Sequence, residues 1–195
     1  MSAVRAAPDE LAVHETSGPV MGMVLFVASE AIFFAALFGG YFSIRASASV
    51  WPPASIGVPE IAVPTILTVI LISSSVILQT GVMAVRRGRI ALFRSLLALT
   101  VFLGLCFLAL QAYDYSRLTF GIADGIYPSL FYVMTGLHMA HVAGGVILLS
   151  VMLAQAMRGG ITGARHETIE GSAIYWHFVD VVWIGLYLAF YVSVR

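Results

Sequence analysis

Apolar residues of this 195-residue chain gather in five runs, separated by short segments that hold most of the charged and turn-forming residues. A helix rises about 1.5 Å per residue, so about 20 apolar residues span the roughly 30 Å hydrocarbon core of a bilayer. The pattern therefore predicts an all-α fold, a polytopic membrane bundle of five transmembrane helices within residues 20–194. The predicted spans are Val20–Ile44, Ile61–Val85, Ser95–Tyr113, Leu130–Met157 and Tyr175–Val194.

Proline and glycine mark the connections between the predicted helices. Trp51-Pro52-Pro53 interrupts the chain after the first run, and the segment Thr119–Pro128 is rich in turn-forming residues. Residues 1–19 are polar and acidic, and they lack the apolar core beside basic residues that a cleavable signal peptide has. We therefore interpret residues 1–19 as a polar cytoplasmic N-terminal segment, and we expect no separate soluble domain.

Composition supports the membrane assignment. Hydrophobic residues make up 60% of the chain and charged residues 10%, and the mean hydropathy is +0.96. A typical soluble domain carries about 25% charged residues, so this chain has too few charges for a water-exposed surface. The basic residues form no stripe of the kind that binds nucleic acid, and we expect no nucleic-acid partner.

The basic residues also predict the orientation of the helices. All 10 Lys and Arg residues are arginines, and seven of them fall on the side of the membrane that holds the N-terminus. The positive-inside rule therefore predicts a cytoplasmic N-terminus and an outside C-terminus. One cluster on the inner side is a candidate site for anionic lipid head groups, with plain anchoring of the topology as the alternative. This cluster is Arg86, Arg87, Arg89 and Arg94.

Glu30 is the only acidic or basic residue in the first run. It lies roughly 15 Å inside the hydrocarbon edge, where an ionised side chain costs at least a few kcal/mol. Phe26, Phe33 and Phe34 share its helix face, and an apolar surrounding favours the protonated form of a carboxyl. Glu30 is therefore a candidate for a hydrogen bond between helices, with proton handling and lipid contact as alternatives.

Two pairs of polar residues lie in the later runs. His138 and His141 share one helix face of the fourth run, and His177 and Asp180 share one face of the fifth. Such residues can bind metals, but neither the Glu-x-x-His repeats of di-iron bundles nor a haem-attachment motif is present, so we predict no metal site. We expect a buried polar network instead, with His177 bonded to Asp180 and either His138 or His141 bonded to Glu30.

Four segments, in order along the chain, resemble subunit III of haem–copper terminal oxidases, the cytochrome c oxidase subunit III family. The resemblance extends from about Met23 to Tyr191, and the fifth-run segment is long enough to be specific. The residues of these segments match the intramembrane polar positions of the family. Two positions differ: Asp114 stands where the family usually has glutamate, and Leu67 stands where asparagine is expected. The segments are Ser29–Phe34, Gln111–Tyr115, Thr135–His138 followed by His141, and Tyr175–Trp183.

The resemblance implies a function that the residues alone do not give. It implies an accessory subunit III of a bacterial proton-pumping cytochrome c oxidase of aerobic respiration, in the plasma (inner) membrane. Such a subunit packs on subunit I in a complex with subunit II, and haem and copper lie in those partners. It has no catalytic residue and binds no cofactor itself. It holds phospholipids in a cleft between its first two helices and the other three, and it supports proton uptake and sustained turnover.

The position-by-position match implies an intramembrane network for packing or lipid contact. Our hypothesis is that Glu30, with His138 or His141 as its partner, joins the two-helix group to the three-helix group. The remaining members of the implied network are His177, Asp180, Gln111 and Asp114.

Other functions stay open at this point. A subunit III of a quinol oxidase or an accessory protein of nitric oxide reductase shares the same helix motifs, and the residues do not identify the electron donor. A more distant alternative is a small proton or ion transporter that uses Glu30 and the histidines as a relay.

Overall fold

The computed structural model describes residues 18–54, 56–159 and 166–195. Within these residues, five α-helices each contain a stretch long and apolar enough to cross a membrane, which confirms the predicted all-α bundle. Their orientation in the membrane stays a prediction, and residues 1–17 of the predicted N-terminal segment lie outside the described residues. The helices are α1 (Gly18–Ser47), α2 (Ala62–Arg86), α3 (Ile90–Arg117), α4 (Ile126–Met157) and α5 (His166–Tyr187), and a π-helical turn, η2 (Leu188–Val192), directly follows α5.

Several helices are longer than the predicted spans. An apolar run marks only the part of a helix that lies in hydrocarbon, whereas the helix itself continues toward the membrane surface. α3 extends to Arg117, and α4 begins at Ile126 rather than Leu130. Pro128 lies in the first turn of α4, where its missing N–H costs no helical hydrogen bond, so it does not mark a loop there.

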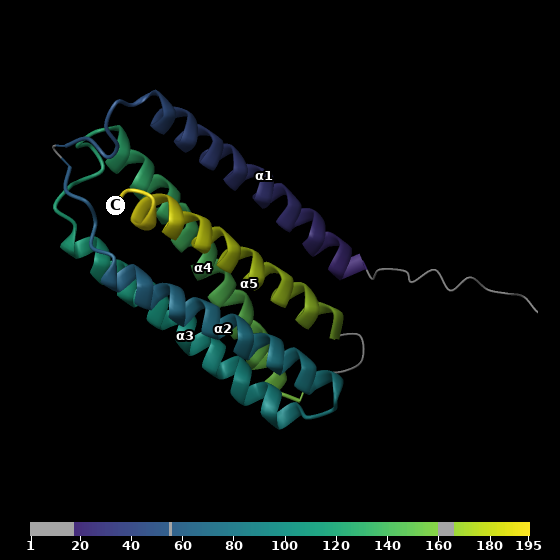
Figure 1. The fold of residues 1–195 in the computed structure, drawn as a ribbon. Helices are drawn as coiled ribbons and strands as arrows, with labels where there is room; N and C mark the ends of the chain where they lie inside the picture. Colours follow the sequence, from purple (N-terminus) through teal and green to yellow (C-terminus); the bar gives the residue numbers. More distant parts are fainter. Residues whose placement is uncertain (1–17, 55, 160–165) are drawn as a thin grey trace, which may run out of the picture.

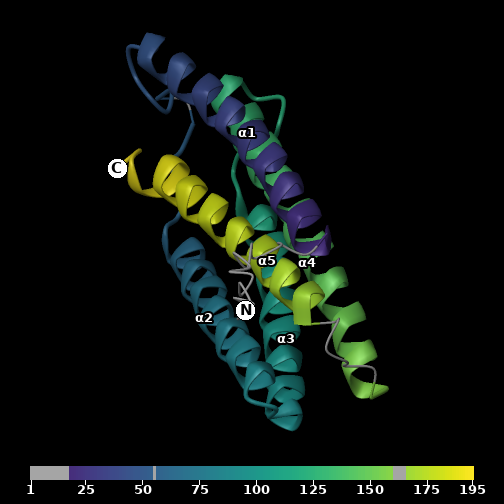
Figure 2. The ribbon, with the colours of Figure 1, turned by 90° about the vertical axis from the view of Figure 1, so that its right-hand side faces the viewer.

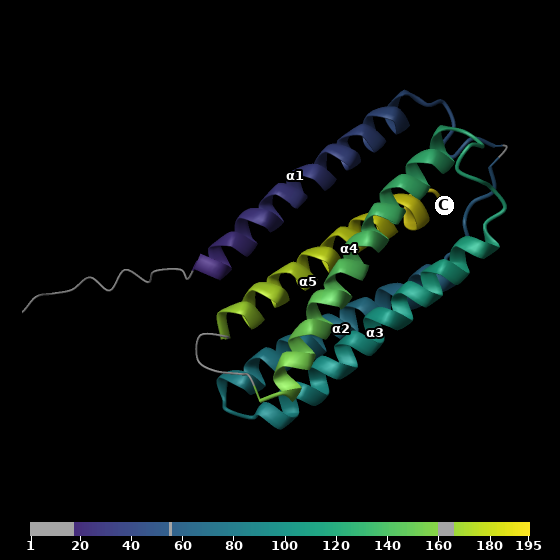
Figure 3. The ribbon, with the colours of Figure 1, turned by 180° about the vertical axis from the view of Figure 1, so that it is seen from behind.

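α5 is the centre of the bundle and α1 lies at its edge (Figure 1). α5 packs against α1, α2 and α4, while α2 and α3 form an antiparallel pair. Of the residues in the apolar stretch of α5, 56% are buried, against 6% for α1. α4 crosses obliquely from the end of α1 toward the start of α3, which Figure 3 shows from behind.

The grouping of α1 with α2, expected from the resemblance, is wrong. The two helices are not packed against each other, because α2 instead packs along α3 and α5. A turn of only three residues at Gly88, whose φ is 71°, folds α3 back onto α2. Figure 2 shows α2 and α3 on one side of α5 and α1 on the other. α1 and α2 therefore do not form one packed group that faces α3, α4 and α5.

Trp176 fixes the packing of α5 against α3 and α4. Its indole is completely buried between two glycines, Gly104 of α3 and Gly145 of α4. A methyl group on Gly104 would lie 2.8 Å from the indole, and one on Gly145 would also lie 2.8 Å from it. These distances are shorter than van der Waals contact, so only glycine lets the three helices approach this closely.

Hydrogen bonds from α5 to hydroxyl groups of α2 hold these two helices together. The indole N–H of Trp176 donates to Ser74 Oγ at 3.0 Å, and that of Trp183 donates to Thr68 Oγ1 at 2.9 Å. The hydroxyls of Tyr187 and Thr65 lie 2.8 Å apart, one helical turn further on. Because lipid offers no hydrogen-bond partners, these bonds select α2 as the neighbour of α5.

Directly after α5, the π-helical turn frees backbone carbonyl groups, and side chains of other helices donate hydrogen bonds to them. The Ser193 N–H donates to Leu188 O at 2.9 Å, five residues back, and so leaves Ala189 O without its usual partner. The hydroxyl of Tyr41 in α1 donates to Ala189 O at 2.7 Å, and that of Tyr127 in α4 donates to Phe190 O at 3.2 Å. This turn therefore joins α1, α4 and α5.

Candidate functional site

Glu30 and His141 form a polar pair between α1 and α4. Glu30 Oε2 lies 3.0 Å from His141 Nε2, and His141 Nδ1 lies 2.8 Å from the backbone carbonyl of Leu137. A carbonyl can only accept, so Nδ1 carries a proton. The contact between His141 Nε2 and Glu30 Oε2 then holds one shared proton. Glu30 is either a carboxylic acid bonded to a neutral imidazole or a carboxylate bonded to an imidazolium. The pair is neutral overall in both forms, which suits a membrane interior.

Aromatic side chains of α1 and α5 surround this pair. The ring of Phe34 meets the imidazole of His141 edge-on at 5.0 Å between centroids, and the Tyr175 hydroxyl donates to the His141 backbone carbonyl at 3.0 Å. Phe26 stacks on Tyr175 at 6.0 Å. The side chains of Glu30 and His141 keep exposed fractions of 22% and 17%, so one edge of the pair faces outward.

His138 is not the partner of Glu30. It is completely buried, stacks on Trp183 at 5.3 Å and 27°, and meets Phe107 edge-on at 5.9 Å. Neither of its ring nitrogens has a hydrogen-bond partner among the described residues. Residues three apart on a helix differ in direction by about 60°, so only His141 reaches α1 while His138 faces α3 and α5. Of the two histidines considered, the structure pairs Glu30 with His141.

A second polar group lies between α2 and α5. His177 Nδ1 is hydrogen-bonded to the Ser75 hydroxyl, and His177 Nε2 lies 3.3 Å from Gln79 Oε1. Asp180 Oδ2 is 4.0 Å from His177 Nδ1, which is too long for the hydrogen bond that the sequence predicts. The carboxyl oxygens of Asp180 are buried without a hydrogen-bond partner among the described residues.

Neither Ser75 nor Gln79 was predicted from the sequence as a partner of His177. The signal that could have found this group was Gln79 itself, the one amide side chain in the second predicted span. An amide in hydrocarbon needs a partner as a carboxyl does, but its lack of charge makes it less conspicuous.

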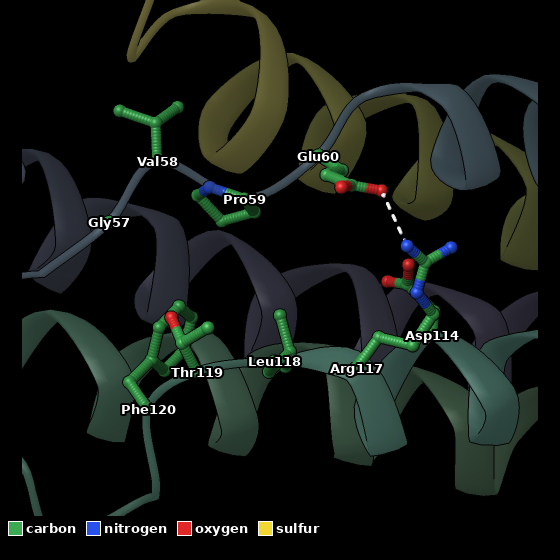
Figure 4. Close-up of a pocket in the computed structure, with 9 residues that line it drawn as sticks. All are labelled: Gly57, Val58, Pro59, Glu60, Asp114, Arg117, Leu118, Thr119 and Phe120. Atoms are coloured by element: carbon green, nitrogen blue, oxygen red, sulfur yellow. Dashed lines mark ion pairs between the residues drawn. The ribbon is translucent and has the colours of Figure 1, made fainter.

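The remaining predicted network residues, Gln111 and Asp114, lie toward the C-terminal end of α3, where Asp114 lines a cavity of about 290 Å³. Figure 4 shows Glu60 reaching across this cavity to Arg117, with the ion pair 3.3 Å long and Asp114 beside it. Asp114 is buried and accepts a long hydrogen bond of 3.4 Å from the Tyr191 hydroxyl. Gln111 is completely buried, and its amide has no partner among the described residues.

The arginine cluster is divided by its contacts. Arg86 is bound by Glu170 of α5, with Nη2 and Nε at 2.8 and 3.1 Å from the same carboxylate oxygen. Arg87 and Arg89 are exposed, and Arg94 is half-buried beside a groove between α3 and α4. Arg86 therefore links α2 to α5, while Arg87, Arg89 and Arg94 are better placed to contact lipid head groups.

The polar groups stay in separate places rather than gathering at one centre. Among the described residues, no group of three or more His, Cys, Asp or Glu side chains is arranged to hold a metal ion. The Glu30, His177 and Asp114 sites each join neighbouring helices. The fold and these sites define a multi-pass helical membrane protein in which polar side chains link the helices.

Comparison with known proteins identifies the family. The family model for cytochrome c oxidase subunit III matches residues 9–194. The cytochrome c oxidase subunit 3 of Corynebacterium diphtheriae is 38% identical over 95% of this chain and 94% of its own length. The subunit 3 of Thermostichus vulcanus is 37% identical over 90% of this chain and 88% of its own, and that of Branchiostoma lanceolatum is 40% identical over 90% and 69%.

The chain therefore belongs to the cytochrome c oxidase subunit III family. This confirms the resemblance carried by the four sequence segments, and it assigns the chain to a multisubunit oxidase of the respiratory chain.

Proposed function

We propose that this chain is the accessory subunit III of a bacterial proton-pumping cytochrome c oxidase in the plasma membrane. The main support is the similarity to the Corynebacterium diphtheriae subunit, which extends over 94% of that protein. In this proposal, the chain packs on subunit I in a complex that also contains subunit II. Cytochrome c rather than quinol is the proposed donor, because the relatives with this similarity are named as cytochrome c oxidase subunits.

The chain alone is non-catalytic in this proposal, and the partner subunits hold the haem and copper. The contacts of its polar residues support this role. Glu30 binds His141, His177 binds Ser75, and Asp114 accepts from Tyr191, so each of these groups links one helix to another. Links of this kind stabilise a membrane bundle, in which lipid and helix surfaces are equally apolar.

Phospholipid binding, proton uptake and sustained turnover complete the proposal. Arg87, Arg89 and Arg94 are the proposed contacts for anionic head groups, since no carboxylate of the described residues pairs with them. The outward edge of the Glu30–His141 pair is the proposed point where the chain influences proton uptake by its partner.

Purification through this chain tests the assignment. The tagged chain is extracted from its native membrane in a mild detergent, followed by a reduced-minus-oxidised spectrum and mass identification of co-purifying proteins. We expect haem absorption, a large multi-span subunit I and a subunit II that binds cytochrome c. A colourless and monodisperse preparation of this chain alone would contradict the proposal.

Removal of the chain tests its contribution to turnover. An oxidase purified from a strain lacking this chain is expected to start oxygen reduction normally, to take up protons more slowly and to lose activity during turnover. The parental complex and a strain complemented with the intact gene are the controls. Equal stability and proton uptake in the presence and absence of the chain would contradict the supporting role.

A further inference from the structure

Polar side chains face outward from the middle of the bundle on the side formed by α2 and α5. Gln79, Thr80 and Ser73 of α2 are exposed, and the side chain of His177 is 37% exposed. A shallow groove of about 320 Å³ runs between the two helices at this level. Its lining residues are Ser75, Val76, Gln79, Thr80, Met83 and His177.

This strip lies at the depth of lipid tails. Gln79 is about two helical turns from Arg86, which corresponds to roughly 10 Å, and Ser75 lies one further turn inside. Lipid tails offer neither donors nor acceptors, so an amide turned toward them loses the hydrogen bonds it makes in water. The outward positions Leu99 and Phe102 of α3 and Ile147 of α4 are apolar, as contact with lipid requires.

Contacts within the chain leave part of the strip unsatisfied. Gln79 Oε1 can only accept, so the contact from His177 Nε2 requires a proton on that nitrogen. In the neutral imidazole, Nδ1 is then an acceptor, and the Ser75 hydroxyl donates to it. This chain of hydrogen bonds ends at the Gln79 amide nitrogen, which has two N–H donors and no partner among the described residues.

We propose that the α2–α5 strip docks a transmembrane helix of another oxidase subunit, and that this helix offers a hydrogen-bond acceptor to the Gln79 amide nitrogen. A protein helix fits because the strip is too deep for lipid head groups and its exposed amide needs a partner that lipid tails lack. The inference rests on the proposed function, since it requires a complex with other membrane subunits.

Photo-crosslinking in the purified complex tests the docking surface. A photoreactive amino acid replaces Gln79 in one variant and Leu99 in the other, because both positions are exposed and lie at similar depths on different faces. We expect an adduct between this chain and another oxidase subunit from position 79, at several times the yield from position 99. A haem-containing complex with no adduct at 79, or with equal yields, would overturn the inference and leave the proposed function intact.

Substitution of Gln79 separates docking from lipid exposure by the sign of the effect. If the face meets lipid, Gln79→Leu replaces an unfavourable amide and leaves subunit retention equal or higher. If it docks a helix, Gln79→Leu should weaken retention of the partner about three- to tenfold, the equivalent of one membrane hydrogen bond. Gln79→Asn, which keeps the amide, should restore part of the retention.

The control for folding is Met83→Leu, an apolar exchange in the same groove. It should leave retention at the parental value, and the amount of each variant in the membrane shows that the chain itself is intact. Parental retention in Gln79→Leu at parental membrane levels would overturn the inference.

Discussion

α1 and α5 are both apolar spans, yet they occupy opposite kinds of environment. α5 is the least apolar of the five spans and the most buried, whereas α1 is among the most apolar and is the least buried. In a soluble protein the order would be reversed. In a bilayer, lipid solvates apolar side chains as well as protein does, so the helix with tryptophans, hydroxyls and a carboxyl is the one that needs protein neighbours.

The contacts of the two helices differ accordingly. α5 is held along its length by the Trp176 indole, which lies between two glycines, and by hydrogen bonds to α2, whereas α1 makes a few separate hydrogen bonds. Near its C-terminal end, Tyr41 binds the carbonyl of Ala189, and Arg45 donates to the hydroxyl and carbonyl of Ser193. In the N-terminal half of α1, the Glu30–His141 pair supplies the hydrogen bond to another helix among the described residues. The hydrogen bonds that place α1 are therefore few and separate, and they add to the packing of its aromatic side chains on α5.

The largest expected effect is on α5, through Gly145→Ala. The new methyl group would lie 2.8 Å from the buried indole of Trp176, which has no room to move, so stability should fall by about 3 kcal/mol. Release of the chain from the purified complex during an SDS titration measures this. Gly144→Ala is the matched control, because its methyl group would lie 3.5 Å from Tyr175 and should be tolerated. Equal effects of both variants would show that the glycine-lined space is not needed.

Tyr41→Phe should have the next largest effect, on the C-terminal attachment of α1. The substitution keeps the buried ring but removes the bond to Ala189 O and the acceptor for the Trp51 indole N–H. Loss of two buried hydrogen bonds should cost about 2 kcal/mol in the same titration. Tyr113→Phe is the control, since Tyr113 is 52% exposed. A Tyr41→Phe variant as stable as this control would contradict the attachment.

Glu30→Ala should cost about 1–2 kcal/mol, because it removes one hydrogen bond between helices in the membrane. Glu30→Gln should preserve assembly, since a side-chain amide can donate to Nε2 of a neutral His141. Retention of the chain in the complex measures both. Assembly and turnover of Glu30→Ala at the parental level would show that the pair does not hold α1.

Arg45→Gln should have the smallest effect, about 0.5–1 kcal/mol. Its two bonds to Ser193 lie at the exposed end of the helix, where water can replace them. The SDS concentration at which half of the chain leaves the complex, compared between Arg45→Gln and Tyr41→Phe, measures the difference in stability. A larger loss for Arg45→Gln would reverse the order of importance at this end.

The sequence predicted the five spans and the need of Glu30 for a partner, because apolar length and an intramembrane carboxyl are local features. It did not distinguish His141 from His138, since the direction of each histidine depends on how α4 crosses its neighbours. The partners Ser75 and Gln79 of His177 were missed for the same reason. The hydrogen bond of Tyr41 could not be predicted either. It needs the Ala189 carbonyl that the π-helical turn frees, and no residue pattern predicts that turn.

The distance between α1 and α4 tests the account most directly. In a Cys106→Ala background, spin labels at positions 25 and 147 report on the Glu30–His141 level, and labels at 42 and 192 report on the C-terminal end of α1. We predict that Glu30→Ala broadens the first distance distribution and leaves the second unchanged, while Glu30→Gln resembles the parent at both pairs. An unchanged distribution between positions 25 and 147 in Glu30→Ala would contradict the claim that this pair holds α1 against α4 at that level.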